Sequence, residues 1–173
     1  MLAIGSIGVI GTPIVIDVNK NGRPDLQDDD WRPDSNVNKE ATVCFDLDGD
    51  GEKEAIEWLK ADQDALLAID LNGNEIVDDG HELFGSTGGF KDGFAKLSHF
   101  DLDGNGKIEK EELAPLRLWI DNGDGFCTVE EMHFLKDYEI DVLKTTNQGK
   151  VGHCIADGES IMMWDWYTEH LSQ

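Results

Sequence analysis

The residues of this chain best suited to chemistry are closely spaced oxygen-bearing side chains between Asp101 and Glu112, in the run DLDGNGKIEKEE. A twelve-residue cation loop takes its ligands from positions 1, 3, 5, 7, 9 and 12, and position 6 is a glycine that permits a sharp turn. Those ligand positions hold Asp101, Asp103, Asn105, Lys107 (through its backbone carbonyl), Glu109 and Glu112. Hard oxygen ligands in this number and order suit Ca²⁺, so the run predicts a calcium site.

Four further Asp/Asn/Gly runs resemble altered copies of this loop. The second copy, residues 46–57, offers Asp46, Asp48, Asp50, Glu52, Glu54 and Glu57. The third, residues 70–82, offers Asp70, Asn72, Asn74, Asp78 and Glu82. In the third copy Glu75 replaces the turn glycine, where a positive φ would strain it, and the closing glutamate comes one residue late.

The last two copies are less regular. The fourth, residues 17–28, offers Asp17, Asn19, Asn21, Asp25 and a shorter closing residue, Asp28. The fifth, residues 121–131, is one residue short and offers Asp121, Asn122, Asp124 and Glu131. This shortened loop either binds metal or serves as a structural partner of the loop before it. The five runs together predict about three to five calcium ions as the cofactor.

The segments around the loops indicate the elements that position them. Apolar residues flank the best loop with helical spacing, at Phe94, Leu97 and Phe100 before it and at Leu113, Leu116 and Trp119 after it. Residues 91–137 are therefore predicted to be helical apart from the loops. Thr128 and Glu131 are predicted to form a capping box for a helix that runs to about Lys136. In an EF-hand-like arrangement, Ile108 would enter the core beside a paired loop.

The remaining segments favour strands. PIVIDV, TVCFDL and AIEWL are rich in β-branched and aromatic residues, and EIDVLKT, VGHCIA and SIMMWDWYT read as a C-terminal antiparallel meander. We therefore predict an α+β fold in a single calcium-binding domain, 1–173. Its expected parts are an apolar arm (1–11), a β-rich calcium-loop part (12–60), an EF-hand-like part with short helices (61–137) and the β-meander (138–173).

Composition restricts the partners. Asp and Glu number 37 against 14 Lys and Arg, which gives a formal charge of −23 and excludes nucleic acid and anionic membranes as ordinary partners. The chain has no apolar stretch long enough to span a membrane. Its hydrophobic content of 39% and five tryptophans predict a packed core once cations neutralise the acids. The apolar arm is either the domain's own first strand or an arm that adds to a neighbouring subunit.

Other chemistry has little support. The chain contains no HExxH, GxSxG or CxxC motif, and its five histidines are scattered. Cys44, Cys127 and Cys154 are either three small buried residues or one disulfide with a free thiol. Pairs of carboxylates are better explained as metal ligands than as an acid and base.

The order of several runs resembles a known family. GTPIVIDVNKNG, VCFDLDGDGEKE, LLAIDLNGNEIVDDGHELFG and GFAKLSHFDLDGNGKIE follow one another as in the calcium-binding modules of bacterial RTX-type exoproteins, close to the FrpC-like self-processing module. The resemblance covers residues 11–168 and implies a secreted, calcium-dependent fold. It also implies cleavage of an Asp-Pro bond before the first strand. Here that position is Thr12-Pro13, and the chain has no Asp-Pro bond.

These observations predict a secreted bacterial calcium-binding module that is structural or adhesive and not an enzyme. One alternative is a self-processing or ligating module, which the missing Asp-Pro bond disfavours. Another is a subunit of an extracellular filament joined through the apolar arm. The expected partners are calcium and either other copies of the chain or a cell-surface protein.

Overall fold

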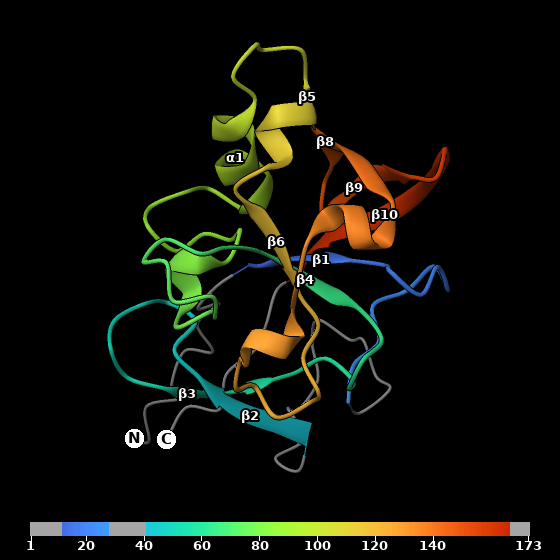
Figure 1. The fold of residues 1–173 in the computed structure, drawn as a ribbon. Coiled ribbons are helices and arrows are strands. Elements are labelled where there is room, and N and C mark those ends of the chain that lie inside the picture. The colour runs from blue at the N-terminus through green and yellow to red at the C-terminus, as the bar shows by residue number, and fades with distance from the viewer. Residues whose placement is uncertain (1–11, 28–40, 167–173) are drawn as a thin grey trace, which may run out of the picture.

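An eight-stranded antiparallel sheet is the main element of the computed structural model, which describes residues 12–27 and 41–166. The strand order is β5-β8-β9-β10-β1-β4-β6-β7 (Figure 1). The strands are β1 (Ile14–Ile16), β4 (Ala65–Ile69), β5 (Lys107–Glu109), β6 (Leu116–Trp119), β7 (Met132–His133), β8 (Ile140–Gln148), β9 (Val151–Ala156) and β10 (Glu159–Asp165). A separate hairpin pairs β2 (Thr42–Phe45) with β3 (Glu54–Glu57).

Helical structure is short. The described residues contain one α-helix, α1 (Gly93–Leu97). The 3₁₀ turns are η2 (Gly80–Glu82), η3 (Ser98–Phe100), η4 (Lys110–Leu113), η5 (Val129–Glu131) and η6 (Leu135–Tyr138). No helix among the described residues is long and apolar enough to cross a membrane.

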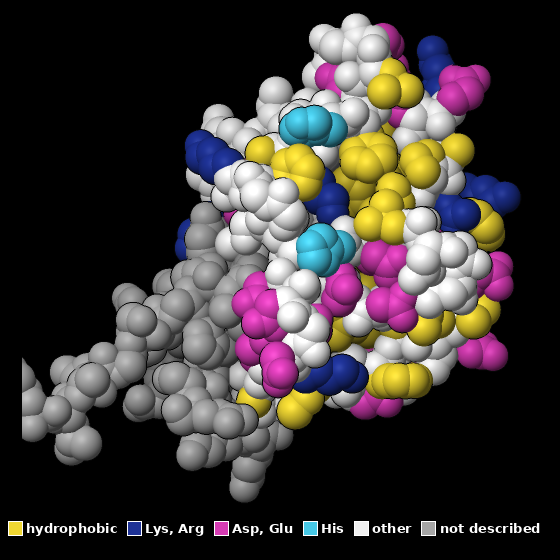
Figure 2. Space-filling model, turned by 90° about the vertical axis from the view of Figure 1, so that its left-hand side faces the viewer, with side chains coloured by type: hydrophobic (Ala, Val, Ile, Leu, Met, Phe, Trp, Pro, Cys, Tyr) yellow, Lys and Arg dark blue, Asp and Glu magenta, His cyan; other side chains and the backbone are white. Residues whose placement is uncertain are grey.

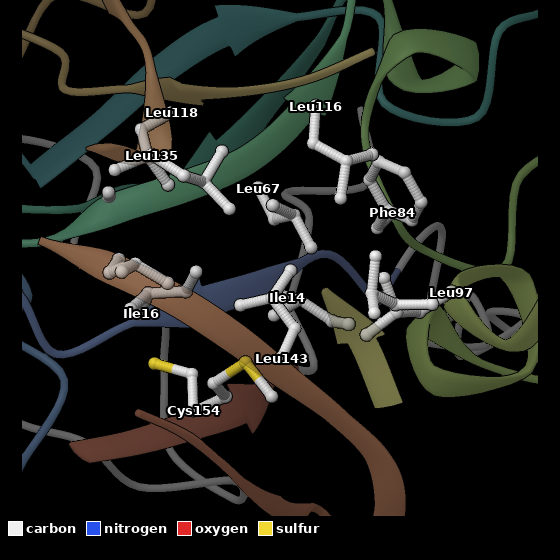
Figure 3. Close-up of a cluster of buried hydrophobic side chains, with 14 of the residues drawn as sticks. Ile14, Ile16, Leu67, Phe84, Leu97, Leu116, Leu118, Leu135, Leu143 and Cys154 are labelled. Carbon is white, nitrogen blue, oxygen red and sulfur yellow. The ribbon is translucent and has the colours of Figure 1, made fainter. Parts of the chain in front are cut away.

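The central strands β1 and β4 are buried on both faces. Successive side chains of a strand point to opposite faces, so Ile14 and Ile16 enter one core cluster and Val15 enters another. Figure 3 shows the first cluster, in which Ile14 lies with Leu97 of α1. The second cluster contains the aromatic rings of Phe45, Trp58, Trp119 and Trp166, with ring centroids 5.5–6.2 Å apart. The loops are thus attached to a sheet with a buried core on each face.

The predicted α+β class is wrong, because the regular secondary structure of the described residues is mostly β, with one short α-helix. The segment Leu116–Trp119, predicted to be helical, forms β6 and pairs with β4 from Leu66↔Trp119 to Ile69↔Leu116. A segment of four mostly apolar residues fits either a helix or a strand. Here its pairing with the buried strand β4 determines that it forms a strand.

The capping box of Thr128 and Glu131 does form, yet it begins only the turn η5 and not a helix to Lys136. The chain then enters β7, which pairs with β6. An EF-hand has a helix on each side of its loop. The Asp101 loop instead follows the short η3 turn, contains strand β5 and ends in the η4 turn, so the predicted EF-hand-like part with helices is wrong.

The C-terminal strands β8, β9 and β10 occur where the sequence predicts a meander, and they are antiparallel. Ile108 is fully buried as expected, but it pairs with Leu143 of β8 and not with a second loop. All three cysteines are free; Cys127 and Cys154 are buried, whereas Cys44 is exposed. The apolar arm 1–11 and Asp28 lie outside the described residues, so the predictions about them stay predictions.

Candidate functional site

All five acidic loops share one backbone arrangement. In the Asp101 loop, Asp101 accepts hydrogen bonds from the backbone N–H groups of Asn105 (3.0 Å) and Gly106 (2.8 Å). The first aspartate of every other loop accepts the equivalent bond, as in Asp17–Gly22 (2.8 Å), Asp46–Gly51 (2.9 Å), Asp70–Glu75 (3.0 Å) and Asp121–Gly125 (3.0 Å). Each loop is therefore wrapped around its first carboxylate, which directs the later side chains toward the same centre.

The side chains at positions 3 and 5 continue this wrapping. Asp103 accepts from the N–H of Asn105 at 3.0 Å, and Asn105 accepts from the N–H of Lys107 at 2.9 Å. The equivalent acceptors in the other loops are Asn19, Asn21, Asp48, Asp50, Asn72, Asn74, Asn122 and Asp124. At position 7 the predicted ligand is a backbone carbonyl, which comes from Lys107 in the Asp101 loop and from Glu52 in the Asp46 loop.

Three loops are closed by a glutamate that holds two backbone N–H groups. Glu112 accepts from Leu102 at position 2 (2.7 Å) and from Glu109 at position 9 (3.2 Å). Glu82 and Glu131 close their loops in the same way, through Leu71 and Asp78 (2.9 and 2.8 Å) and through Asn122 and Thr128 (3.1 and 3.0 Å). The late Glu82 and the shortened fifth loop thus reach the same geometry as the regular loop.

Carboxylates converge in three of the loops. Ligand atoms lie within 4.8 Å of one another in the groups Asp46–Asp48–Asp50–Glu54, Asp101–Asp103–Glu112 and Asp121–Asp124–Glu131. In the Asp70 loop, amide groups bridge the site, because Asn72 and Asn74 both donate to Asp78 (2.7 and 2.8 Å). In the Asp17 loop, Asn19 and Asn21 donate to Asp25 in the same way (2.8 and 2.6 Å). The surface in Figure 2 shows Asp and Glu side chains in several groups across one face.

One predicted ligand is placed elsewhere. Glu57 lies on β3 opposite Thr42 and is not in the cluster of its loop. Glu54 takes the closing role there, since its carboxylate accepts from the N–H of Leu47 at position 2 (3.3 Å). The strand β3 begins at Glu54, so the chain is extended too early for position 12 to fold back.

Sequence reasoning missed Asp64, a buried residue just before β4. Its carboxylate accepts from the backbone N–H of Asp25 in the Asp17 loop at 2.7 Å. Asp64 lies 39 positions from Asp25, outside any twelve-residue window, so ligand spacing could not find it.

Burial makes several of these acids costly to ionise in the absence of a cation. It raises the pKa of Glu54 and of Asp121. Burial also raises the pKa of Asp64 to about 7, and the neighbouring charges of Asp25 and Asp17 act in the same direction. A bound divalent cation reverses this local balance, because it favours the ionised form of every carboxylate around it.

Glu75 is strained at the turn position of its loop, with φ at +64° where Gly22, Gly51 and Gly106 also have positive φ. We expect Glu75→Gly to stabilise the folded protein by about 1 kcal/mol, since a non-glycine residue is disfavoured in this region. Urea unfolding checks this. The Glu75→Ala variant removes the same charge without relieving the backbone, so an equal gain in that variant would show that the charge and not φ is responsible.

Lys96 of α1 holds the end of the Asp70 loop, at His81 and Leu83. Its ammonium group donates to the carbonyls of His81 (2.6 Å) and Leu83 (2.7 Å) and lies over the ring of Phe84. Burial lowers the pKa of Lys96 to about 8, although the negative charges of Asp79 and Glu82 oppose this shift.

This lowered pKa predicts a pH effect. Between pH 8 and 10.5 the unfolded chain keeps the Lys96 proton while the folded chain releases it, so the contribution of Lys96 to stability rises with pH across that window. We expect the unfolding free energy of the wild type, minus that of Lys96→Met, to increase from pH 8 to 10.5. Both proteins contain the same buried cysteines, so the effect of cysteine titration cancels in this difference of unfolding free energies. A difference that stays constant from pH 8 to 10.5 would contradict the prediction.

The comparisons with known proteins match the part of the chain that contains these loops. The SPM domain family matches residues 14–169, which includes every described loop. The chain is also similar to the iron-regulated protein FrpA of Neisseria meningitidis serogroup C, with 35% identity over 138 residues. This region is 75% of the present chain and 12% of FrpA, so the similarity concerns one portion of a much longer protein. The resemblance to the FrpC-like family is thereby supported, and the chain belongs to the SPM domain family.

Proposed function

We propose that this chain is a calcium-binding structural module of a bacterial exoprotein, and that its folding depends on Ca²⁺. The observation that carries the proposal is the repeated loop geometry, in which three loops already bring carboxylate oxygens within 4.8 Å of one another. Each loop uses oxygen ligands, with no histidine or cysteine among the converging groups. Such all-oxygen sites favour Ca²⁺ over softer transition metals. Membership of the SPM domain family and similarity to FrpA support an extracellular setting.

Native mass spectrometry tests the calcium proposal directly. We expect about three to five bound ions in calcium and none after EGTA treatment. Glu112→Gln should remove one ion, because Glu112 closes the most regular loop. Glu111→Gln is the matched control, since Glu111 is exposed on the same turn and does not join the cluster. A wild-type protein that binds no calcium at millimolar concentration would refute the proposed function.

We also propose that the module is not an enzyme. Thr12 and Pro13 are buried at the start of the sheet, and the carbonyl of Pro13 accepts from the N–H of Trp166 (2.9 Å). A threonine hydroxyl cannot form the cyclic anhydride that an aspartate carboxylate forms with its own carbonyl. The protein should therefore keep its intact mass after prolonged incubation with Ca²⁺. The comparison variant is Thr12→Asp, which creates an Asp-Pro bond; cleavage of the wild type would overturn the proposal.

A further inference from the structure

The Asp17 loop receives a carboxylate from outside its own sequence. Residues around Asp25 pair with the segment that follows β3, through Gln27 N–H to the Trp58 carbonyl (3.0 Å) and Lys60 N–H to the Asp25 carbonyl (2.8 Å). This pairing brings position 9 of the loop against the turn before β4. Asp64 ends that turn, and its Oδ2 accepts the Asp25 N–H at 2.7 Å.

The same bond is made by the closing glutamate in three of the other loops. Glu82, Glu112 and Glu131 each accept the backbone N–H that lies four or three positions before them, at the ninth position or its equivalent in the short loop. Asp64 makes this contact in the Asp17 loop. It therefore occupies the position of a closing carboxylate, although it approaches from a different part of the chain.

The second oxygen of Asp64 has no partner. Its Oδ1 is buried and has no hydrogen-bond partner among the described residues, and the residue as a whole is only 2% exposed. The carboxylates of Asp17 (3% exposed) and Asp25 (6% exposed) interact electrostatically with it. Asp25 pairs with the exposed guanidinium of Arg23 (Nε–Oδ1 3.4 Å), but the Asp64 Oδ1 stays unpaired, and a buried carboxylate oxygen without a partner is unfavourable unless a cation reaches it.

We propose that Asp64 is a direct ligand of the Ca²⁺ held by the Asp17 loop and supplies the closing carboxylate of that site. This inference rests on the proposed calcium function. It makes the site composite, because Asp17, Asn19, Asn21 and Asp25 come from one segment and Asp64 from the turn that enters β4. Asn19 also reaches this turn, since its amide donates to Gln63 at 3.2 Å.

The shared backbone geometry provides a site-resolved assay. In each loop one turn amide donates to the first aspartate, so the amide NMR signals of Gly22, Gly51, Glu75, Gly106 and Gly125 report occupancy of the separate sites during a calcium titration. We expect Asp64→Asn to weaken the calcium affinity reported by Gly22 about 10-fold or more. The other four signals should titrate as in the wild type. Asparagine keeps an acceptor for the Asp25 N–H and removes the charge.

Two further variants control this test. Asp62→Asn makes the same change at an exposed residue of the same turn and should leave Gly22 unchanged. Asp28→Asn tests the residue that sequence spacing predicts. If Asp28→Asn weakens the Gly22 response and Asp64→Asn does not, the assignment of Asp64 is overturned.

A wild-type measurement decides the matter if Asp64→Asn does not fold. The ¹³Cγ signal of Asp64 should shift over the same calcium concentrations as the Gly22 amide, and a ¹³Cγ signal that stays constant while Gly22 responds would overturn the proposal. Failure of the calcium function itself looks different, because none of the five turn amides of the wild type would respond.

Discussion

Removing calcium is expected to lower the melting temperature by about 5–10 °C for each occupied site. A ligand at 100 times its dissociation constant stabilises the native state by about 2.7 kcal/mol, and a domain of this size changes its melting temperature by about 2–4 °C per kcal/mol. Three sites would contribute as much as the whole stability of a typical domain. The formal charge of −23 adds repulsion among the acids once the ions are gone.

Near-UV circular dichroism measures this loss, because Trp58, Trp119 and Trp166 are buried in one aromatic cluster. We expect their signal to disappear in EGTA and to return with excess Ca²⁺. Sodium chloride at the same ionic strength is the control, since it screens charges without filling the loops. Equal melting curves in calcium and EGTA would mean that the loops are stable without cations.

Replacing Asp121 by alanine is expected to destabilise the protein by about 3 kcal/mol or more, even in excess calcium. The Asp121 carboxylate accepts from the indole N–H of Trp58 at 2.6 Å and from the N–H groups of Gly123 and Gly125. Its removal leaves these donors without their acceptor in a buried region, where each lost bond to a charged group costs about 1.5–3 kcal/mol. Asp121 therefore connects the fifth loop to the aromatic core.

Urea unfolding compares this variant with Asp124→Ala. Asp124 belongs to the same carboxylate group but is exposed and bonds only within the loop, to the N–H of Phe126. Asp124→Ala should reduce ion binding at the fifth loop and cost much less stability at saturating calcium. If the two variants lose the same free energy, the Trp58 contact has no special role.

The positions of the loops could be predicted from sequence because a twelve-residue loop is a local structure. Asx-type bonds between neighbours, such as Asp101 to Gly106, depend only on residue type and spacing. The local pattern tolerates small changes in length. The third loop has one extra residue and the fifth has one fewer, yet Glu82 and Glu131 still take the closing position.

The strands and the composite site could not be predicted in this way. Leu116–Trp119 is a strand because β4 lies beside it, and Glu57 is drawn out of its loop by pairing with β2. Asp64 meets Asp25 only because the segments around Leu26 and Leu59 bridge. Each of these outcomes depends on a partner that is remote in sequence. Hydrophobic periodicity and ligand spacing are local patterns, so they carry no information about such a partner.

The pairing of β1 with β10 joins the two ends of the described chain, from Ile14↔Asp165 to Ile16↔Met163. The middle of the sheet therefore cannot close until the last strand is available, which is a contact of very high sequence separation and a slow step in folding. The acidic loops are held by bonds between neighbouring residues, so they can form before this long-range pairing does. Loss of β10 would leave β1 with an open edge beside β4, exposed to pairing with other chains.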